Sequence, residues 1–225
     1  MEKKKRAFAS VLFFVAFIVW TLIVCFVDVK EIGPQQTSVG LASLNGRFHE
    51  IVGVNVFFYT LTDWLSVIPL AVAFGFAVAG FVQLCKRKSF LKVDRGILFL
   101  GAFYIATIFA YLFFEFVVIN YRPILIEGQL EASYPSSTTV LVLCVMIPSA
   151  IELKIRMEKG VLRAIILSFV ALFVAFMLAG RILSGVHWLS DIIGGILLSL
   201  GILTSYSNFQ LDRRRYHHTK HQNRC

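Results

Sequence analysis

The chain has 225 residues, of which 58% are hydrophobic and 16% charged, and it contains 22 phenylalanines. Its mean hydropathy of +0.78 excludes an ordinary soluble domain, in which about a quarter of the residues carry a charge. The net charge of +9 is also found in nucleic-acid-binding proteins. Here, however, the basic residues cluster beside apolar segments, so we expect no nucleic-acid partner and predict that the partner is a lipid bilayer.

Six apolar segments are each long enough to cross a bilayer as a helix, which takes about 20 residues. They cover residues 7–27, 62–85, 96–119, 135–153, 161–181 and 190–209. We therefore predict an all-α, polytopic membrane protein, in which residues 1–225 form a single transmembrane domain of six helices. Residues 210–225 should form a basic cytoplasmic tail.

The basic residues are unevenly distributed between the two ends of these segments. If the six helices alternate in direction, all but four of the 22 lysines and arginines fall on one side of the membrane. The four exceptions are Lys30, Arg47, Arg122 and Arg181. Because positive charge is retained on the cytoplasmic side, both termini should be cytoplasmic, in a multi-pass protein of the plasma membrane.

The longest predicted connection, residues 28–61, follows the first segment on the extracytoplasmic side. Within it, residues 39–45 are expected to form a short helix on the membrane surface. Asp63 is expected to cap the second spanning helix. Pro69 is expected to kink that helix, because proline lacks a backbone donor.

Polar residues that are costly at membrane depth gather where the fifth apolar segment ends and the sixth begins. Arg181, His187 and Asp191 follow the spacing Arg-x5-His-x3-Asp. Residues four apart share a helix face, so the carboxylate can hold one ring nitrogen and leave the other free to attack. Arg181 adds a planar cation suited to phosphate oxygens. Next along the chain, Gly194 and Gly195 permit close helix packing.

Two other connections end on the same predicted side of the membrane. Arg122, followed by a proline, ends the third apolar segment, and residues 135–138 begin the fourth. A proline in a first helical turn marks a helix start, where free N–H groups and the helix dipole suit an anion. The hydroxyls of Ser136, Ser137 and Thr138 add donors, although such a stretch is also an ordinary helix cap.

These blocks resemble those of the type 2 phosphatidic acid phosphatase (PAP2) family, which shares its site with the vanadium haloperoxidases, and in particular its membrane lipid phosphatase branch. The family pattern is Lys-x6-Arg-Pro, then Pro-Ser-Gly-His, then Ser-Arg-x5-His-x3-Asp. The third block matches here, with Gly180 in place of the serine. The second has Thr138 at the histidine position, and the first keeps Arg122 but has Glu115 at the lysine position.

The resemblance implies a PAP2-like helical bundle whose catalytic-type core spans about residues 96–209, with its site on the extracytoplasmic face. His187 would be the nucleophile that forms a phosphohistidine, and Asp191 would orient it and stabilise its cationic form. No metal or other cofactor is implied, since arginines would neutralise the developing charge. The phosphate-binding residues would be Arg122, Ser136, Ser137 and Arg181.

The implied function is a metal-independent phosphatase acting on a lipid phosphate or pyrophosphate of phosphatidate or polyprenyl type. The family histidine in the second block protonates the leaving group, and the hydroxyl of Thr138 is a weaker acid. Thr138 and Glu131 are therefore the candidate general acids, with His49 in the connection after the first segment as a further alternative. Glu115 either faces the site and repels the substrate or points into a helix interface. Because of these departures, the activity could be reduced. Alternatively, the protein could be a family relative that binds or translocates phospholipid or polyprenyl phosphate without hydrolysing it.

Overall fold

The computed structural model describes the backbone of residues 2–222 and the side chains of residues 4, 5 and 7–211. Within this part the chain is all-helical, without strands, as predicted. Its elements are α1 (Glu2–Phe26), η1 (Pro34–Gln36), α2 (Ala42–Val52), α3 (Val56–Leu65), α4 (Val67–Arg87), η2 (Phe90–Lys92), α5 (Arg95–Phe116), α6 (Ser137–Arg156), α7 (Val161–Ser184) and α8 (Leu189–Gln222).

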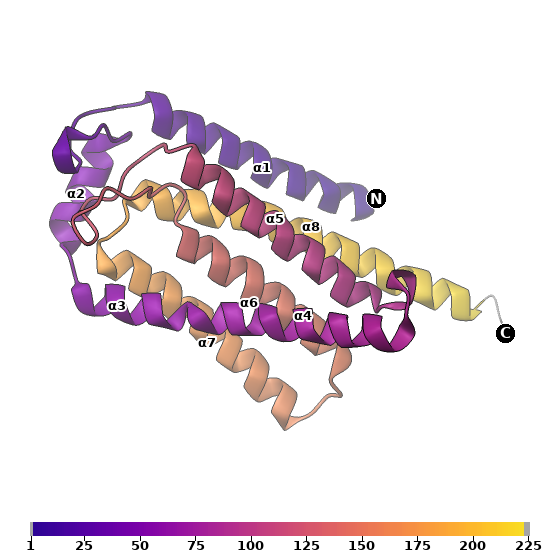
Figure 1. Ribbon diagram of the computed structural model, residues 1–225. Helices are drawn as coiled ribbons and strands as arrows, with labels where there is room; N and C mark the ends of the chain where they lie inside the picture. The colour runs from indigo at the N-terminus through magenta and orange to yellow at the C-terminus, as the bar shows by residue number, and fades with distance from the viewer. Residues whose placement is uncertain (1, 223–225) are drawn as a thin grey trace.

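Six stretches of helix in the described residues are long and apolar enough to cross a membrane. They are Ala7–Phe26, Val56–Arg87, Arg95–Phe116, Ser137–Arg156, Val161–Ser184 and Leu189–Leu211. Each overlaps the predicted segment, which confirms a multi-pass membrane protein. The second stretch begins earlier than predicted, because α3 runs almost directly into α4 (Figure 1).

The helix break predicted near Pro69 lies at Ser66, between α3 and α4. A proline cannot donate to the carbonyl four residues earlier, and its ring crowds that carbonyl. For Pro69 this is the carbonyl of Leu65, the last residue of α3. The break therefore appears one turn before the proline.

The connection between α1 and α4 differs from the prediction in one respect and agrees with it in another. The surface helix exists as α2, although it begins later and runs further than residues 39–45. The prediction that Asp63 caps a spanning helix was wrong, since the helix has already begun and Asp63 lies inside α3. Asn55 is the cap, and its side chain accepts a hydrogen bond from the amide of Phe58.

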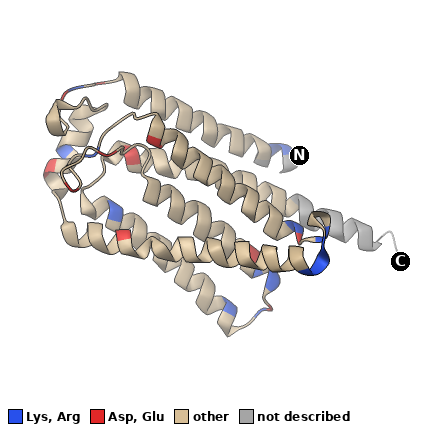
Figure 2. Cartoon of the chain, in the orientation of Figure 1, with Lys and Arg blue, Asp and Glu red and all other residues tan. Residues whose placement is uncertain are grey.

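The start of α1 and the end of α8 lie at the same end of the bundle, opposite α2 (Figure 1). Lysines and arginines gather at the end with the termini, around the α4–α5 turn and the α6–α7 connection (Figure 2). The positive-inside rule associates such an end with the cytoplasm. Helix α8 continues into the predicted basic tail, residues 210–225, whose side chains from residue 212 onward lie outside the described residues.

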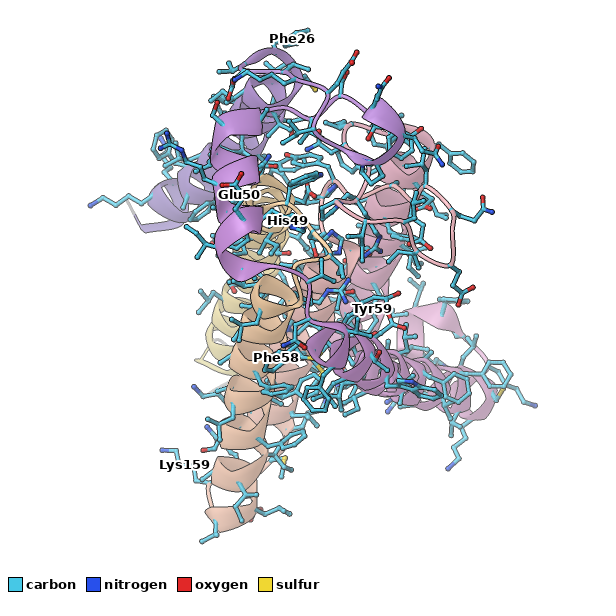
Figure 3. The ribbon with its side chains drawn as sticks, turned by 90° about the vertical axis from the view of Figure 1, so that its left-hand side faces the viewer. Phe26, His49, Glu50, Phe58, Tyr59 and Lys159 are labelled. Atoms are coloured by element: carbon cyan, nitrogen blue, oxygen red, sulfur yellow. The ribbon has the colours of Figure 1, made fainter. Side chains whose placement is uncertain are left out.

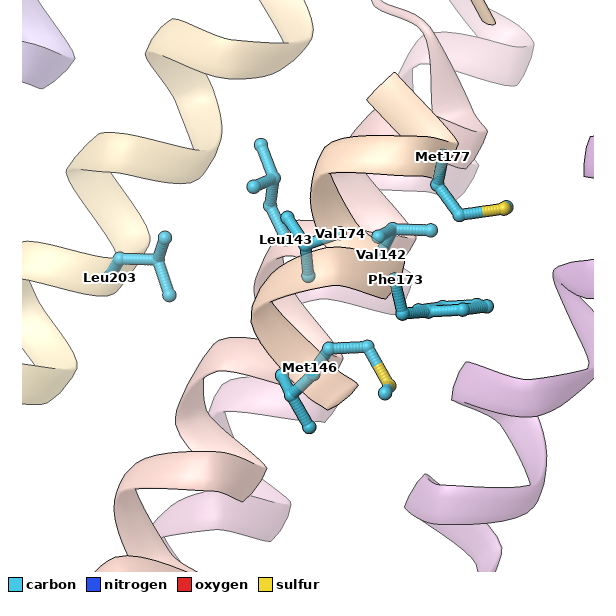
Figure 4. Close-up of a cluster of buried hydrophobic side chains, with 8 residues drawn as sticks. Val142, Leu143, Met146, Phe173, Val174, Met177 and Leu203 are labelled. Atoms are coloured by element: carbon cyan, nitrogen blue, oxygen red, sulfur yellow. The ribbon is translucent and has the colours of Figure 1, made fainter. Parts of the chain in front are cut away.

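Helices α6 and α8 form the centre of the bundle. In each, 61% of the spanning stretch is buried, against 6% for the stretch through α3 and α4. The largest hydrophobic cluster joins α6, α7 and α8 (Figure 4). Because lipid tails are as apolar as these side chains, close packing rather than the hydrophobic effect holds such helices together. The cluster consists of Val142, Leu143, Met146, Val170, Phe173, Val174, Met177 and Leu203.

The first turns of α8 pack tightly against the connection that leads into α6. A Cβ atom at Gly194 would lie 2.6 Å from the ring of Tyr134, and one at Gly195 would lie 3.1 Å from the carbonyl oxygen of Ser136. The paired glycines thus permit the close packing predicted for them. This packing brings the start of α8, with Asp191, against the start of α6.

We expect Gly194→Leu to lower the free energy of unfolding by about 1–3 kcal/mol, because the new side chain would overlap the Tyr134 ring. Thermal unfolding in detergent measures the loss. The matched control is Gly75→Leu in α4, where a Cβ meets nothing within 4 Å. Equal stability of the two variants would contradict this account of the α8 packing.

Candidate active site

His187 lies between two arginine side chains. Its Nε2 is 2.9 Å from Nη2 of Arg181 and 3.3 Å from Nη1 of Arg122. Arg181 comes from the last turn of α7, Arg122 from the α5–α6 connection and His187 from the α7–α8 connection. The ring of His187 is buried, and so is Arg181, with 1% of its surface exposed. Two sequence blocks therefore meet around one ring nitrogen.

Helix α3 holds Arg181 in place. The Nη1 of Arg181 donates to the hydroxyl of Thr62 at 3.3 Å, and its guanidinium lies 5.8 Å from the ring centroid of Tyr59. A Cβ atom at Gly180 would lie 2.5 Å from the methyl group of Thr62. This contact explains why glycine precedes the arginine here, where the family pattern has serine.

The α5–α6 connection folds back on itself and delivers Arg122. The amide of Arg122 donates to the carbonyl of Glu131 at 3.1 Å, and the amide of Ser133 donates to the carbonyl of Asn120 at 2.9 Å. The side chains of Arg122 and Glu131 also form an ion pair, with Nε and Oε2 3.0 Å apart. This pair lacks hydrogen-bond geometry, so the Nε–H of Arg122, like that of Arg181, has no acceptor within the described residues.

Asp191 is fully buried and accepts four hydrogen bonds. Its Oδ1 accepts from the side chains of Asn120 at 3.1 Å and Ser190 at 3.3 Å. Its Oδ2 accepts from the hydroxyl of Ser133 at 2.5 Å and the amide of Trp188 at 3.0 Å. A carboxylate offers about four lone-pair sites, so this set of donors satisfies the ionised form completely.

The sequence predicts that Asp191 orients His187 directly, but the structure links them through Ser133. The hydroxyl oxygen of Ser133 lies 3.0 Å from Nδ1 of His187 and is also bonded to Asp191. Sequence reasoning missed both Ser133 and Asn120, which lie in an irregular connection without helical periodicity. Their only signal is their position as polar residues just before a sequence block, Asn120 before Arg122 and Ser133 before Ser136.

The three hydroxyl residues of the second block lie in different surroundings, although the sequence predicts that all three face the site. Ser136 is fully buried, its amide donates to the carbonyl of Asp191 at 3.0 Å, and its hydroxyl accepts from Thr139 at 3.0 Å. Ser137 lines a cavity of about 220 Å³ beside the site. Thr138 instead lines a second groove, of about 310 Å³, between α4, α5 and α6. Ser137 lines both the cavity and the groove, whereas Thr138 lines only the groove.

The 220 Å³ cavity is lined by Arg122, Glu131, Ser133 and Ser137 and by Glu115 from the last turn of α5. It has room for several water molecules, at about 30 Å³ each, and hence for a phosphate group. His187 and Arg181 do not line this cavity, so its lining places Glu115 beside Arg122 alone and favours, of the two alternatives, the one in which Glu115 faces the phosphate-binding side. Figure 3 looks onto this end of the bundle, where Tyr59 and His49 are labelled.

His187 is held in its neutral form. Its pKa lies well below the usual range, first because burial disfavours the charged ring and then because Arg122 and Arg181 repel a further positive charge. The arginines can only donate hydrogen bonds, so a neutral ring can present its lone pair to them at Nε2. The arrangement is a nucleophilic nitrogen flanked by two cations, which suits attack on a bound phosphoryl group.

Comparison with known proteins identifies two similarities. A model of the PAP2 superfamily matches residues 96–215, which confirms the resemblance seen in the three sequence blocks. The fold resembles the crystal structure of the first transmembrane PAP2 type phosphatidylglycerolphosphate phosphatase from Bacillus subtilis. That match has a TM-score of 0.54 at 14% identity and covers 91% of this chain and 97% of the other. A search of curated protein sequences gave no match.

The low pKa of His187 predicts how stability depends on pH. The unfolded ring takes up a proton near pH 6.5, whereas the folded ring resists it, so stability present above about pH 6.5 should be lost on acidification. Thermal unfolding at about pH 7.5 and about pH 5.5 measures this loss. His187→Gln should reduce the difference between the two. Burial also lowers the pKa of His49, so His49 should contribute separately to the pH dependence of stability. His49→Gln should remove that contribution. An unchanged pH dependence in both variants would contradict the assignment.

Proposed function

Because the chain belongs to the PAP2 superfamily, we propose that it is an integral-membrane phosphatase acting on a lipid phosphate or pyrophosphate. The observation that carries this proposal is the position of His187 Nε2 between two guanidinium groups at one end of a transmembrane bundle. The buried Nε–H of Arg181 supports it, since a tetrahedral anion would supply the acceptor that this group lacks, whereas the Nε of Arg122 already faces the carboxylate of Glu131. The Bacillus subtilis neighbour, a phosphatidylglycerolphosphate phosphatase, supports a phospholipid class of substrate.

In the first step, the lone pair of His187 Nε2 attacks the phosphorus atom. An N–P bond forms as the P–O bond to the leaving group breaks, and the leaving oxygen keeps the bonding pair. Arg122 and Arg181 neutralise the charge on the non-bridging oxygens, which is the largest stabilisation that such a site offers. The ring becomes cationic in the phosphohistidine, and the nearby carboxylate of Asp191 stabilises that charge.

In the second step, water attacks the phosphohistidine and gives a proton to the carboxylate of Glu131, which shares the cavity with Arg122. The N–P bond breaks, its electron pair returns to Nε2, and inorganic phosphate leaves. An alkoxide leaving group in the first step needs a proton, whereas the phosphate released from a pyrophosphate needs it less. Of the candidate acids, Glu131 shares the cavity with Arg122, while Thr138 lines another groove, so we assign this role to Glu131. Because Glu131 is ion-paired with Arg122 in this structure, it must take up a proton before it can donate one, and the proton that it receives from water in the second step supplies the next turnover.

We place the site on the extracytoplasmic side of the plasma membrane, with both termini in the cytoplasm. The support is the concentration of lysines and arginines at the end of the bundle where the chain begins (Figure 2), whereas His187 lies in the α7–α8 connection at the other end. A lipid of the outer leaflet would then present its phosphate to the arginines while its tails remain in the bilayer.

The central test is phosphate release by purified protein from a panel of lipid phosphates and pyrophosphates in EDTA. His187→Ala should abolish release, and an alkaline quench of the wild type should trap a phosphohistidine that the variant lacks. The control is His49→Ala, whose ring packs on Trp188 at 5.5 Å rather than on the arginines. Wild-type turnover in His187→Ala would refute the mechanism. Binding without release by the wild type would favour the non-hydrolysing alternative.

The assignment of the acid gives a second test. Glu131→Gln should lower the rate on lipid phosphate monoesters by up to about 10²–10⁴-fold and the rate on pyrophosphates by less. Thr138→Val removes only a hydroxyl and is the matched control, for which we expect little change in either rate. A selective loss of monoester activity in Thr138→Val, with none in Glu131→Gln, would assign the acid to the threonine instead.

A further inference from the structure

We propose that Ser133 positions the nucleophile, by joining Nδ1 of His187 to the carboxylate of Asp191 and so fixing which ring nitrogen attacks. The inference rests on the proposed function, since it takes His187 as the nucleophile. Ser133 lies outside the three sequence blocks, in the connection before the second block. It is a buried residue, with 2% of its surface exposed.

The direction of each hydrogen bond follows from counting protons. A serine hydroxyl has one proton, and an ionised carboxylate only accepts. The bond of 2.5 Å from Ser133 to Asp191 Oδ2 therefore uses the hydroxyl proton. The contact of 3.0 Å between Ser133 and His187 must then run the other way, with Nδ1–H donating to the hydroxyl oxygen.

The contacts at Nε2, on the opposite side of the ring, independently indicate that the proton is on Nδ1. Both groups near Nε2 are guanidinium nitrogens, 2.9 Å and 3.3 Å away, and a guanidinium has no acceptor. Nε2 must accept, so it carries the lone pair. A neutral histidine has one ring proton, and both lines of reasoning place it on Nδ1. His187 therefore points its nucleophilic nitrogen at the space between the arginines.

The backbone holds Ser133 in this role. Its amide donates to the carbonyl of Asn120, and the side chain of Asn120 donates to the other oxygen of Asp191. Asp191 has no further acceptor site for a direct bond from His187, because Trp188 and Ser190 fill the rest. The Ser133 hydroxyl thus links the carboxylate of Asp191 to the ring of His187 by hydrogen bonds. When Nε2 gains the phosphoryl group, the proton stays on Nδ1 and its bond to Ser133 becomes charge-assisted.

The first test compares Ser133→Ala with Ser133→Thr in the phosphate-release assay. Alanine removes the link but leaves both arginines, so kcat should fall about 10- to 100-fold while KM changes little. Threonine keeps a hydroxyl and should recover part of the lost kcat. The control is Ser149→Ala, which removes a buried hydroxyl bonded to Tyr104, far along α6 from the site, and should leave kcat unchanged. A wild-type kcat in Ser133→Ala would overturn the proposal.

The second test needs no turnover, and it uses a variant only to assign the His187 signal. Nitrogen-15 NMR of histidine-labelled wild-type protein, with His187 assigned by comparison with His187→Gln, reports which ring nitrogen carries the proton. We expect protonation at Nδ1, and protonation at Nε2 would overturn the proposal. The two tests also separate this inference from the proposed function. If the wild type hydrolyses no substrate, the proton position still decides the role of Ser133, whereas turnover with an unaffected Ser133→Ala refutes the link alone.

Discussion

A buried, ionised carboxylate organises one end of this bundle, and the polar connections are arranged around it. An unpaired charge at membrane depth is costly, but Asp191 is surrounded by donors from both the α5–α6 and the α7–α8 connections. The network extends to α2, because the side chain of Asn45 both donates to and accepts from Ser190. Removing a single donor would leave the anion underbonded, so the two connections and α2 depend on one another.

The rest of the site is held by contacts between backbone segments. The connection between α2 and α3 packs against the end of α7, where the amide of Asn55 donates to the carbonyl of Ser184 at 3.0 Å. Gly185 has φ of +65°, and a Cβ atom there would lie 1.8 Å from the carbonyl oxygen of Gly53. Only glycine fits this approach, which turns the chain from α7 towards His187. The connection between α2 and α3 therefore supports the third sequence block.

The charges around His187 explain how one pocket can favour both a neutral nucleophile and an anionic ligand. Two guanidinium groups oppose protonation of the ring and leave positive charge available for phosphate oxygens. Glu131 partly offsets that charge through its ion pair with Arg122, and Glu115 brings a second carboxylate to the cavity.

The sequence by itself determined the six spanning helices and the proximity of the third-block residues, because apolar length and the spacing of neighbouring residues are local properties of a segment. It also indicated the paired arginines, through the shared side of the membrane on which their connections end. Only the tertiary structure decided that Asp191 reaches His187 through Ser133, that Asn120 completes the carboxylate, and that Thr138 faces another groove. These features depend on how the α5–α6 connection folds back on itself and docks against α8. Long-range backbone contacts and side-chain packing set that path, and no periodic pattern in the chain records it.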